Sequence, residues 1–283
     1  MMKKVFVALS SLLLVACTKA GLEVANLPNA FSDTKTIKDI VYGPEPWQKL
    51  DVYVPAHSST ESLPVVVFFY GGSWKDGSKD MYPFVGEIFA KQGYITVIAD
   101  YSKYPHVKFP TFVEDGAKAV AWTYRHIAEY KGNPDRLFVS GHSAGAHIGA
   151  LVTADKHYLQ AEGETPSIIK AFAGLSGPYD FVPYEQDYID MFGPPKNYPN
   201  MQVTTFIDGK EPPMLLLWGA DDIIVGKSNM DKLIAKIETE QGVVESNVYA
   251  GVDHVGMLSG FIWFFKSKAP IIDDITGFFQ RYK

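Results

Sequence analysis

The chain is most constrained by a serine between two glycines, in the run Val139-Ser140-Gly141-His142-Ser143-Ala144-Gly145. The residues before Ser143 are typical of a strand end, and the small residues after it are typical of a helix start. A tight turn between the two leaves no room for side chains beside the serine, and Gly141 and Gly145 remove them. The pattern predicts a strand–turn–helix unit with an exposed Ser143 hydroxyl beside the free N–H groups of a helix N-terminus.

Continuous apolar runs predict the rest of the fold. Together with one alternating and one more polar strand, the predicted strands are 50–54, 65–70, 94–99, 136–140, 171–175, 214–218 and 244–249. Uninterrupted apolar strands are typical of a parallel sheet that is buried on both faces. Predicted helices lie between them at 83–92, 111–130, 144–155, 227–241 and 271–282. The alternation predicts an α/β fold in which helices cover both faces of a mostly parallel sheet.

Length and charge narrow the classes of protein. The 283 residues suffice for one large α/β domain, which we place at residues 36–283. The net charge of −6 argues against a nucleic-acid partner. Oligomeric state is left open.

One segment interrupts the alternation of strands and helices. Residues 177–213 are rich in Pro, Tyr, Phe and Asp and show no clean helical pattern. The segment follows a central strand, so it should lie over the carboxyl edge of the sheet, where ligands bind in open α/β sheets. We therefore expect a short cap over the serine. The residues expected to line the pocket are Trp74, His106, Tyr179, Tyr184 and Tyr188.

A serine hydroxyl becomes a good nucleophile when a base removes its proton, and the base needs an acid to orient it. Of the seven histidines, His254 lies in a glycine-flanked loop directly after the last predicted strand, where it can reach back over the sheet edge. We expect His254 to be the base. The side chain of His142 is expected to point away from the serine, and that of His147 to pack along its helix.

The orienting acid should follow an earlier strand. The apolar run 214–218 leads into Gly219-Ala220-Asp221-Asp222, a glycine turn with two carboxylates. The order Ser143, Asp222, His254 is the one used by hydrolases with this kind of serine turn. Asp222 is the predicted acid, and Asp221 remains the alternative.

A second glycine motif follows the first buried strand, in Tyr70-Gly71-Gly72-Ser73-Trp74. Its glycines would let backbone N–H groups approach a carbonyl that Ser143 attacks. With the N–H of Ala144, the loop would supply two or three donors to a developing oxyanion.

These motifs, in this order, resemble the α/β-hydrolase fold, in the esterase group whose oxyanion loop reads His-Gly-Gly-x-Trp. The resemblance covers roughly residues 40–283 and implies a serine esterase with no metal or organic cofactor, acting on a small-molecule ester. It places the oxyanion donors on Gly72, Ser73 and Ala144. Tyr70 departs from the pattern, because the group has a loop-supporting histidine there. An arylformamidase or small-amide hydrolase is the alternative enzyme, and an inactive surface-anchored binding protein is the alternative of another class.

The N-terminal residues suggest where in the cell the protein is located. Lys3 and Lys4 precede an apolar stretch at 5–15 that ends in Leu14-Val15-Ala16-Cys17, where Cys17 is the only cysteine of the chain. This run resembles a bacterial lipobox, which implies a signal peptide at 1–16, lipidation of Cys17 and a tether at 17–35. The bilayer would then be a partner, and Thr18 favours the outer membrane over retention in the inner one. The lipobox places the protein in the bacterial cell envelope. A plain signal peptide is the alternative, and it would make the protein a simple secreted one.

Overall fold

A computed structural model of the chain describes residues 21–27, 32–56, 62–262 and 269–283. Cys17 and the predicted signal peptide lie outside these ranges. Within them, no helix combines the length and the apolar character that crossing a bilayer requires.

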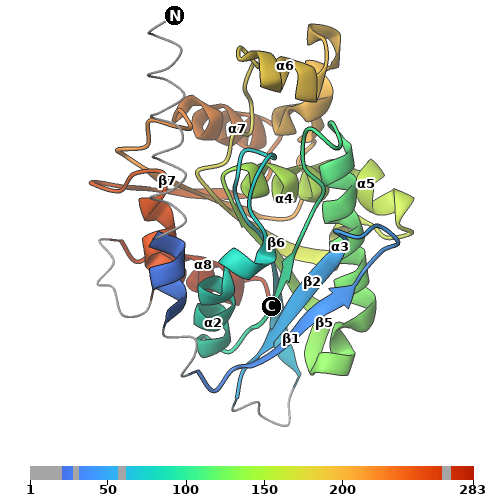
Figure 1. Cartoon of the computed structure of the whole chain (residues 1–283). Helices are drawn as coiled ribbons and strands as arrows, with labels where there is room; N and C mark the ends of the chain where they lie inside the picture. The colour runs from blue at the N-terminus through green and yellow to red at the C-terminus, as the bar shows by residue number, and fades with distance from the viewer. Residues whose placement is uncertain (1–20, 28–31, 57–61, 263–268) are drawn as a thin grey trace, which may run out of the picture.

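The centre of the molecule is an eight-stranded sheet in the order β1-β2-β4-β3-β5-β6-β7-β8 (Figure 1). β2 is antiparallel to both of its neighbours, and the strands from β4 to β8 run parallel. The strands are β1 (Lys35–Val41), β2 (Lys49–Val54), β3 (Leu63–Phe69), β4 (Ile95–Ala99), β5 (Gly132–His142), β6 (Ile169–Leu175), β7 (Met214–Gly219) and β8 (Val244–Tyr249). The prediction of a mostly parallel sheet in an α/β-hydrolase fold is confirmed.

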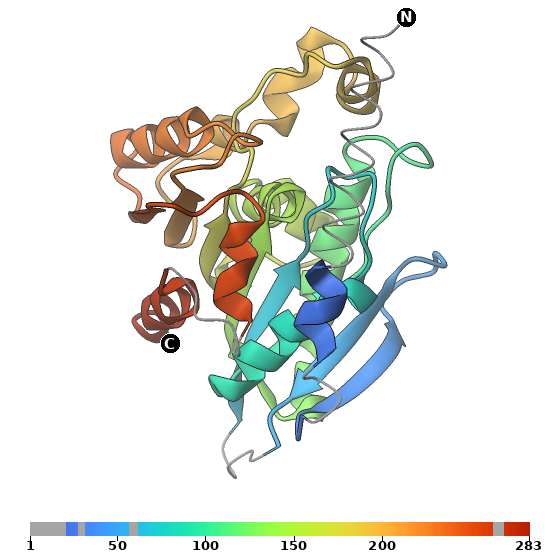
Figure 2. The same cartoon turned by 60° about the vertical axis from the view of Figure 1, so that its left-hand side comes forward.

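Helices cover both faces of this sheet, as predicted. The α-helices are α2 (Pro83–Lys91), α3 (Thr111–His126), α4 (Ala144–Ala154), α5 (Lys156–Ala161), α6 (Gln186–Phe192), α7 (Ser228–Thr239) and α8 (Ile271–Gln280). α2 and α8 lie on one face with the 3-10 helix η7 (Gly256–Phe261), while α3 and α4 lie on the other (Figure 2). α6 stands above the sheet edge, in the segment predicted to be a cap (Figure 1).

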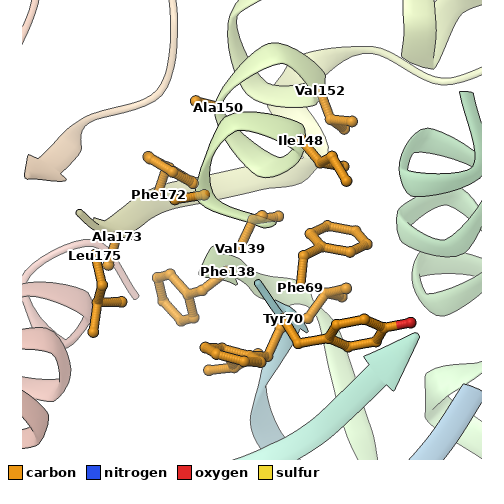
Figure 3. Close-up of a cluster of buried hydrophobic side chains, with 14 of the residues drawn as sticks. Phe69, Tyr70, Phe138, Val139, Ile148, Ala150, Val152, Phe172, Ala173 and Leu175 are labelled. Carbon is orange, nitrogen blue, oxygen red and sulfur yellow. The ribbon is translucent and has the colours of Figure 1, made fainter. Parts of the chain in front are cut away.

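The central strands are apolar because both of their faces are buried. In β5, Phe138 stacks on Phe279 of α8 with ring centroids 4.4 Å apart, while the next residue, Val139, faces α4. Figure 3 shows Ile148 and Val152 of α4 above Phe69 and Val139 of the sheet. A Cβ on Gly149 would lie 3.0 Å from both Val139 and Phe172, so a glycine there lets α4 approach the sheet closely.

β1 was not predicted, and its sequence explains why. Its residues, Lys-Thr-Ile-Lys-Asp-Ile-Val, are mostly exposed, and the pairing with β2 shifts register between Ile37 and Ile40. Asp39 in this bulge has a φ of 58°. The bulge places the two isoleucines out of simple alternation, so the period-two signal of a strand is lost.

Residues 21–27 are helical, whereas the sequence predicted an irregular tether over 17–35. Leu22 and Ala25 of this helix are buried. The Asn26 side chain donates to the Met81 carbonyl at 3.0 Å and accepts from the N–H of Phe84 at 2.9 Å. Asn26 thereby satisfies an N–H in the first turn of α2, which a tether would leave unpaired. The short helices α5 and α6 were not predicted either.

Candidate active site

Ser143 lies at the apex of the turn between β5 and α4. Its backbone is strained, with φ 55° and ψ −124°, and its N–H donates to the Leu175 carbonyl at 2.9 Å. A Cβ on Gly141 would lie 2.5 Å from the Gly145 carbonyl oxygen, and one on Gly145 would lie 2.1 Å from that of Phe69. Neither position has room for a side chain, so the two glycines are what allow this turn to form.

The turn also delivers an electropositive helix end to the serine. Ala144 is the first residue of α4, and its N–H has no acceptor within that helix. The helix dipole adds partial positive charge at the same place. A negative charge that develops beside Ser143 is therefore stabilised.

His254 and Asp222 form a buried pair. His254 Nδ1 donates to Asp222 Oδ2 at 2.8 Å, and the N–H groups of Ile224 and Val225 each donate to Oδ1 at 2.9 Å. Burial raises the pKa of Asp222, but the hydrogen bonds from His254 and Val225 outweigh it and leave the pKa below its usual value. The carboxylate is therefore ionised, and it fixes His254 with the lone pair on Nε2.

The structure distinguishes between the two aspartates at this turn. Asp221 is exposed, and its backbone N–H donates to the Val252 carbonyl at 3.0 Å. A Cβ on Gly219 would lie 2.3 Å from that same carbonyl oxygen, so this glycine lets the two loops meet. The close approach of the loops places Asp222, not Asp221, against His254.

His142 connects the serine turn to the loop of His254. Its Nε2 donates to the His254 carbonyl at 2.9 Å, and the two imidazole rings lie 4.7 Å apart. The sequence had suggested only that this side chain points away from Ser143. Sequence spacing gives no sign of the contact, because 112 residues separate the two histidines.

The glycine loop after β3 lies against the serine turn. Gly72, Ser73 and Trp74 all have positive φ, at 135°, 54° and 58°. A Cβ on Gly72 would lie 2.1 Å from the Asp76 carbonyl oxygen, and one on Gly71 would lie 3.1 Å from the Cβ of Ser143. Of the three predicted oxyanion donors, Ser73 and Ala144 line the pocket with Ser143, whereas Gly72 shapes the turn behind them.

Tyr70, which stands where the resembling esterases have a histidine, braces this loop. Its hydroxyl donates to the Asp100 carboxylate, which also accepts the N–H of Lys79 at 2.8 Å. The Tyr101 hydroxyl donates to the Tyr70 carbonyl at 2.8 Å, and their rings stack with centroids 4.8 Å apart. The loop is therefore anchored despite the missing histidine.

A pocket of about 430 Å³ opens above Ser143. The predicted residues Trp74, Tyr184 and Tyr188 line it. Most of the other lining residues are apolar: Pro178, Phe181, Val182, Pro183, Ile223, Ile224 and Val225, with Glu185, Ser228 and Asn229 among the polar ones. Val182, Tyr184, Ile223 and Ile224 are exposed despite their size and form an apolar rim at the mouth. Residues 223–225 were not predicted to line the pocket, although they directly follow Asp222.

Two predicted pocket residues are elsewhere. His106 is exposed on the loop after β4, outside the residues that line the pocket. Tyr179 is buried against Gly174 and Gly177, because both glycines leave space for its ring. Both predictions are wrong, and both followed from chain position without regard to side-chain direction.

The cap is fastened to the glycine loop and to α4. Lys75 pairs with Asp187 of α6 at 3.2 Å and lies 4.8 Å from the Tyr188 ring centroid. On the inner side, His147 Nε2 donates to the Met201 carbonyl at 2.7 Å. Trp74 contacts the rings of Phe181 and Phe192, at 5.7 and 5.0 Å. These contacts hold the segment over the serine, as its chain position predicted.

The chain is similar to several known proteins. A probable isoprenylcysteine alpha-carbonyl methylesterase of Arabidopsis thaliana is 31% identical over 206 residues, which cover 71% of this chain and 41% of that protein. The kynurenine formamidase of Danio rerio is 33% identical over 176 residues, which cover 62% of this chain and 56% of that protein. Esterase B of Lactobacillus rhamnosis superposes with a TM-score of 0.81 at 17% identity, over 100% of this chain and 96% of that one.

The structural likeness supports the α/β-hydrolase fold, while the chain spans about half or less of the two sequence relatives. A family model matches more than half of the chain. The model described as BD-FAE matches residues 50–237, which include the glycine loop, the serine turn, the cap and Asp222. The chain therefore belongs to the BD-FAE family.

Proposed function

We propose that this chain hydrolyses carboxylic esters through an acyl-enzyme on Ser143. The observation that carries the proposal is the combination of a strained serine at a helix N-terminus with a buried Asp222–His254 pair, whose loop is bonded to His142, the residue before Ser143. The structure and sequence similarity to proteins named as esterases agrees with it. No metal or organic cofactor is assigned a role.

The proposal assigns a residue to each step of the reaction. His254 Nε2 accepts the Ser143 proton as Oγ attacks the ester carbonyl carbon, and the carbonyl electrons move onto oxygen. The N–H groups at Ser73 and Ala144 stabilise that oxyanion. Collapse expels the alcohol, which takes the proton from His254. Water then attacks the acyl-enzyme, passes a proton to His254, and releases the acid with Ser143 restored.

A fluorophosphonate probe and p-nitrophenyl acetate test the proposal together. The wild-type chain should be labelled on Ser143 and should hydrolyse the ester. Ser143→Ala should lose both, with a fall in kcat of about 10⁴- to 10⁶-fold. Ser73→Ala is a matched control, because its backbone N–H remains. A wild-type chain that neither reacts with the probe nor hydrolyses the ester would instead support a binding protein.

Amide hydrolysis is the second candidate, and the similarity to a kynurenine formamidase favours it. The same serine, base and oxyanion donors can open a formamide. A direct comparison of kcat/KM on N-formylkynurenine and phenyl acetate separates the two. A preference of more than about 10² for the formamide, or 2.7 kcal/mol, would make the chain an arylformamidase.

The pocket supports neutral substrates with an apolar or aromatic group. Its walls are Trp74, Phe181 and Tyr188, and its rim exposes Ile223 and Ile224. Glu185 in the lining disfavours an anionic substrate, and salt weakens this effect. We expect short or aromatic esters to be preferred over long-chain triglycerides, because α6 is too short to serve as a long apolar lid.

We also propose that Cys17 is lipidated and anchors the enzyme in the cell envelope, at the outer membrane facing the periplasm or cell surface. The support is the sequence Leu14-Val15-Ala16-Cys17. Several acyl chains give stable membrane attachment, whereas one does not. The processed wild type should enter the detergent phase, and Cys17→Ser should yield a soluble enzyme or an uncleaved precursor. A processed wild type that stays in the aqueous phase would make the protein a simple secreted hydrolase.

A further inference from the structure

One buried side chain beside the proposed base, that of His142, has no role in the proposed reaction. His142, next to the nucleophile in sequence, is only 4% exposed, and Nε2 can bond to the His254 carbonyl only as a donor. The two rings are in contact, at 4.7 Å between centroids. One imidazole from the serine turn therefore fixes the backbone of the residue that must accept the serine proton.

The same side chain touches the glycine loop. A Cβ on Gly71 would lie 3.1 Å from His142 Nδ1 and 3.1 Å from the Cβ of Ser143. His142 thus lies between the two loops that the proposed reaction requires in register. A larger or shorter side chain would disturb one or both of them.

The chemistry of a histidine suits this place. Burial, followed by the nearby His254, lowers the pKa of His142 to about 3, so the ring is neutral near pH 7. A protonated, positively charged His142 would repel the imidazolium that forms on His254 during the reaction. A neutral ring supplies a donor without that repulsion.

We propose that His142 is a positioning residue, which holds His254 in register with Ser143 through its hydrogen bond to the His254 carbonyl. This inference rests on the proposed function. It assigns no proton transfer to His142. His142 acts through His254, so its effect should disappear when His254 is removed.

Two substitutions separate the donor from the bulk of the ring. His142→Phe keeps a planar ring and removes the donor, while His142→Gln places an amide N–H near the position of Nε2. We expect His142→Phe to lower kcat on p-nitrophenyl acetate about 10- to 10²-fold with KM within about threefold, the loss expected when a base is misplaced. His142→Gln should remain within about threefold of wild type.

A double-mutant cycle tests whether the effect passes through the base. In a His254→Ala background, His142→Phe should cause no further loss, because residues that act as one unit are not additive. A further loss of tenfold in that background would overturn the proposal. So would equal losses in the Phe and Gln variants, or wild-type kcat in the Phe variant.

A second measurement does not depend on turnover. The proton between His254 Nδ1 and Asp222 should give a far-downfield ¹H resonance in wild type and in His142→Gln. It should broaden or vanish in His142→Phe. If His142→Phe does not fold, His142→Asn replaces it, since its shorter amide cannot reach the His254 carbonyl. An active wild type whose resonance survives in both variants overturns this inference alone, whereas an inactive wild type overturns the proposed function as well.

Discussion

The sheet edge that carries the glycine loop and Ser143 is built differently from the cap, residues 177–213. At the edge, Ser143, Ser73 and Trp74 hold positive φ angles, and Gly72 and Gly145 occupy positions where a side chain would collide with backbone. The cap has a short helix and two 3-10 turns, held mainly by aromatic contacts around Trp74 and by ion pairs such as Lys75–Asp187. Backbone constraints therefore shape the edge around Ser143, whereas side-chain packing holds the cap over it.

Two histidines of one short motif serve the two regions. His142 bonds to the loop of the proposed base, and His147, one turn into α4, bonds to the cap at Met201. Both residues are buried, and both donate to a carbonyl. The carbonyl that accepts from His142 belongs to the loop of the proposed base, whereas the carbonyl that accepts from His147 belongs to the cap.

The largest expected effect is on kcat, and it is expected when Asp222, the proposed acid at the sheet edge, is substituted. Asp222→Asn should lower kcat about 10⁴-fold, because the amide favours the wrong tautomer of His254. Asp221→Asn, its matched control, should change kcat less than threefold, since the Asp221 side chain is exposed. Steady-state kinetics on p-nitrophenyl acetate checks both. Reversed ranking would move the acid to Asp221.

Inside the cap, truncation of Phe192 and truncation of Tyr184 should differ strongly in their effect on the free energy of unfolding. Phe192 is buried among Trp74, Phe109 and Phe181, so Phe192→Ala should lower the free energy of unfolding by about 3–5 kcal/mol. Tyr184 is 83% exposed, so Tyr184→Ala should change it by less than about 0.5 kcal/mol. Urea unfolding measures both. Equal small effects would show that the cap packs loosely on the edge.

Acid should weaken the fold through the two buried histidines. Burial lowers the pKa of His142 to about 3 and that of His147 to about 4, whereas unfolded histidine titrates near 6.5. Between about pH 6.5 and 4 the unfolded chain binds more protons, so stability falls as pH falls, by about 1.4 kcal/mol per unit for each histidine. The lowered pKa of Asp222 adds a loss only at still lower pH.

The contribution of His147, which bonds to the cap, to this pH dependence can be separated from that of His142 at the sheet edge. His147→Gln keeps a donor for the Met201 carbonyl and removes the titration, so it should reduce the slope of unfolding free energy against pH between 6.5 and 5. Urea midpoints at several pH values measure the slope. An unchanged slope in His147→Gln would mean that the cap interface opens to water before the core unfolds.

The smallest expected effect is a change of substrate preference. Tyr184→Ala with Tyr188→Ala should lower kcat/KM on phenyl or naphthyl esters a few-fold, because stacking and apolar area are lost from the pocket wall. On methyl acetate the same double variant should stay near wild type. Uniform loss across the panel would assign a structural role to the segment and place specificity around Trp74 and Ile223.

The contrast between the sheet edge and the cap also explains which features could be predicted from the sequence. The serine turn, the glycine loop and the order of Asp222 and His254 leave local signatures, since each needs a glycine or a strand end at a fixed place. The roles of His106 and Tyr179 depend on which way a side chain points, and sequence position does not determine that. The same holds for the bulged β1, for the helix at 21–27 and for the contact of His142 with His254.

That N-terminal helix has a consequence for how the enzyme would move. Through Asn26 it is fastened to α2, so it moves with the body of the molecule (Figure 2). Four peptide steps back from Gly21 to Cys17 reach about 14 Å when fully extended. With acyl chains on Cys17, as proposed, so short a connection would permit lateral diffusion and restricted rocking but little free tumbling. The proposed hydrolase would then sample a layer of solution next to the membrane, with its mouth confined to a limited range of orientations toward it.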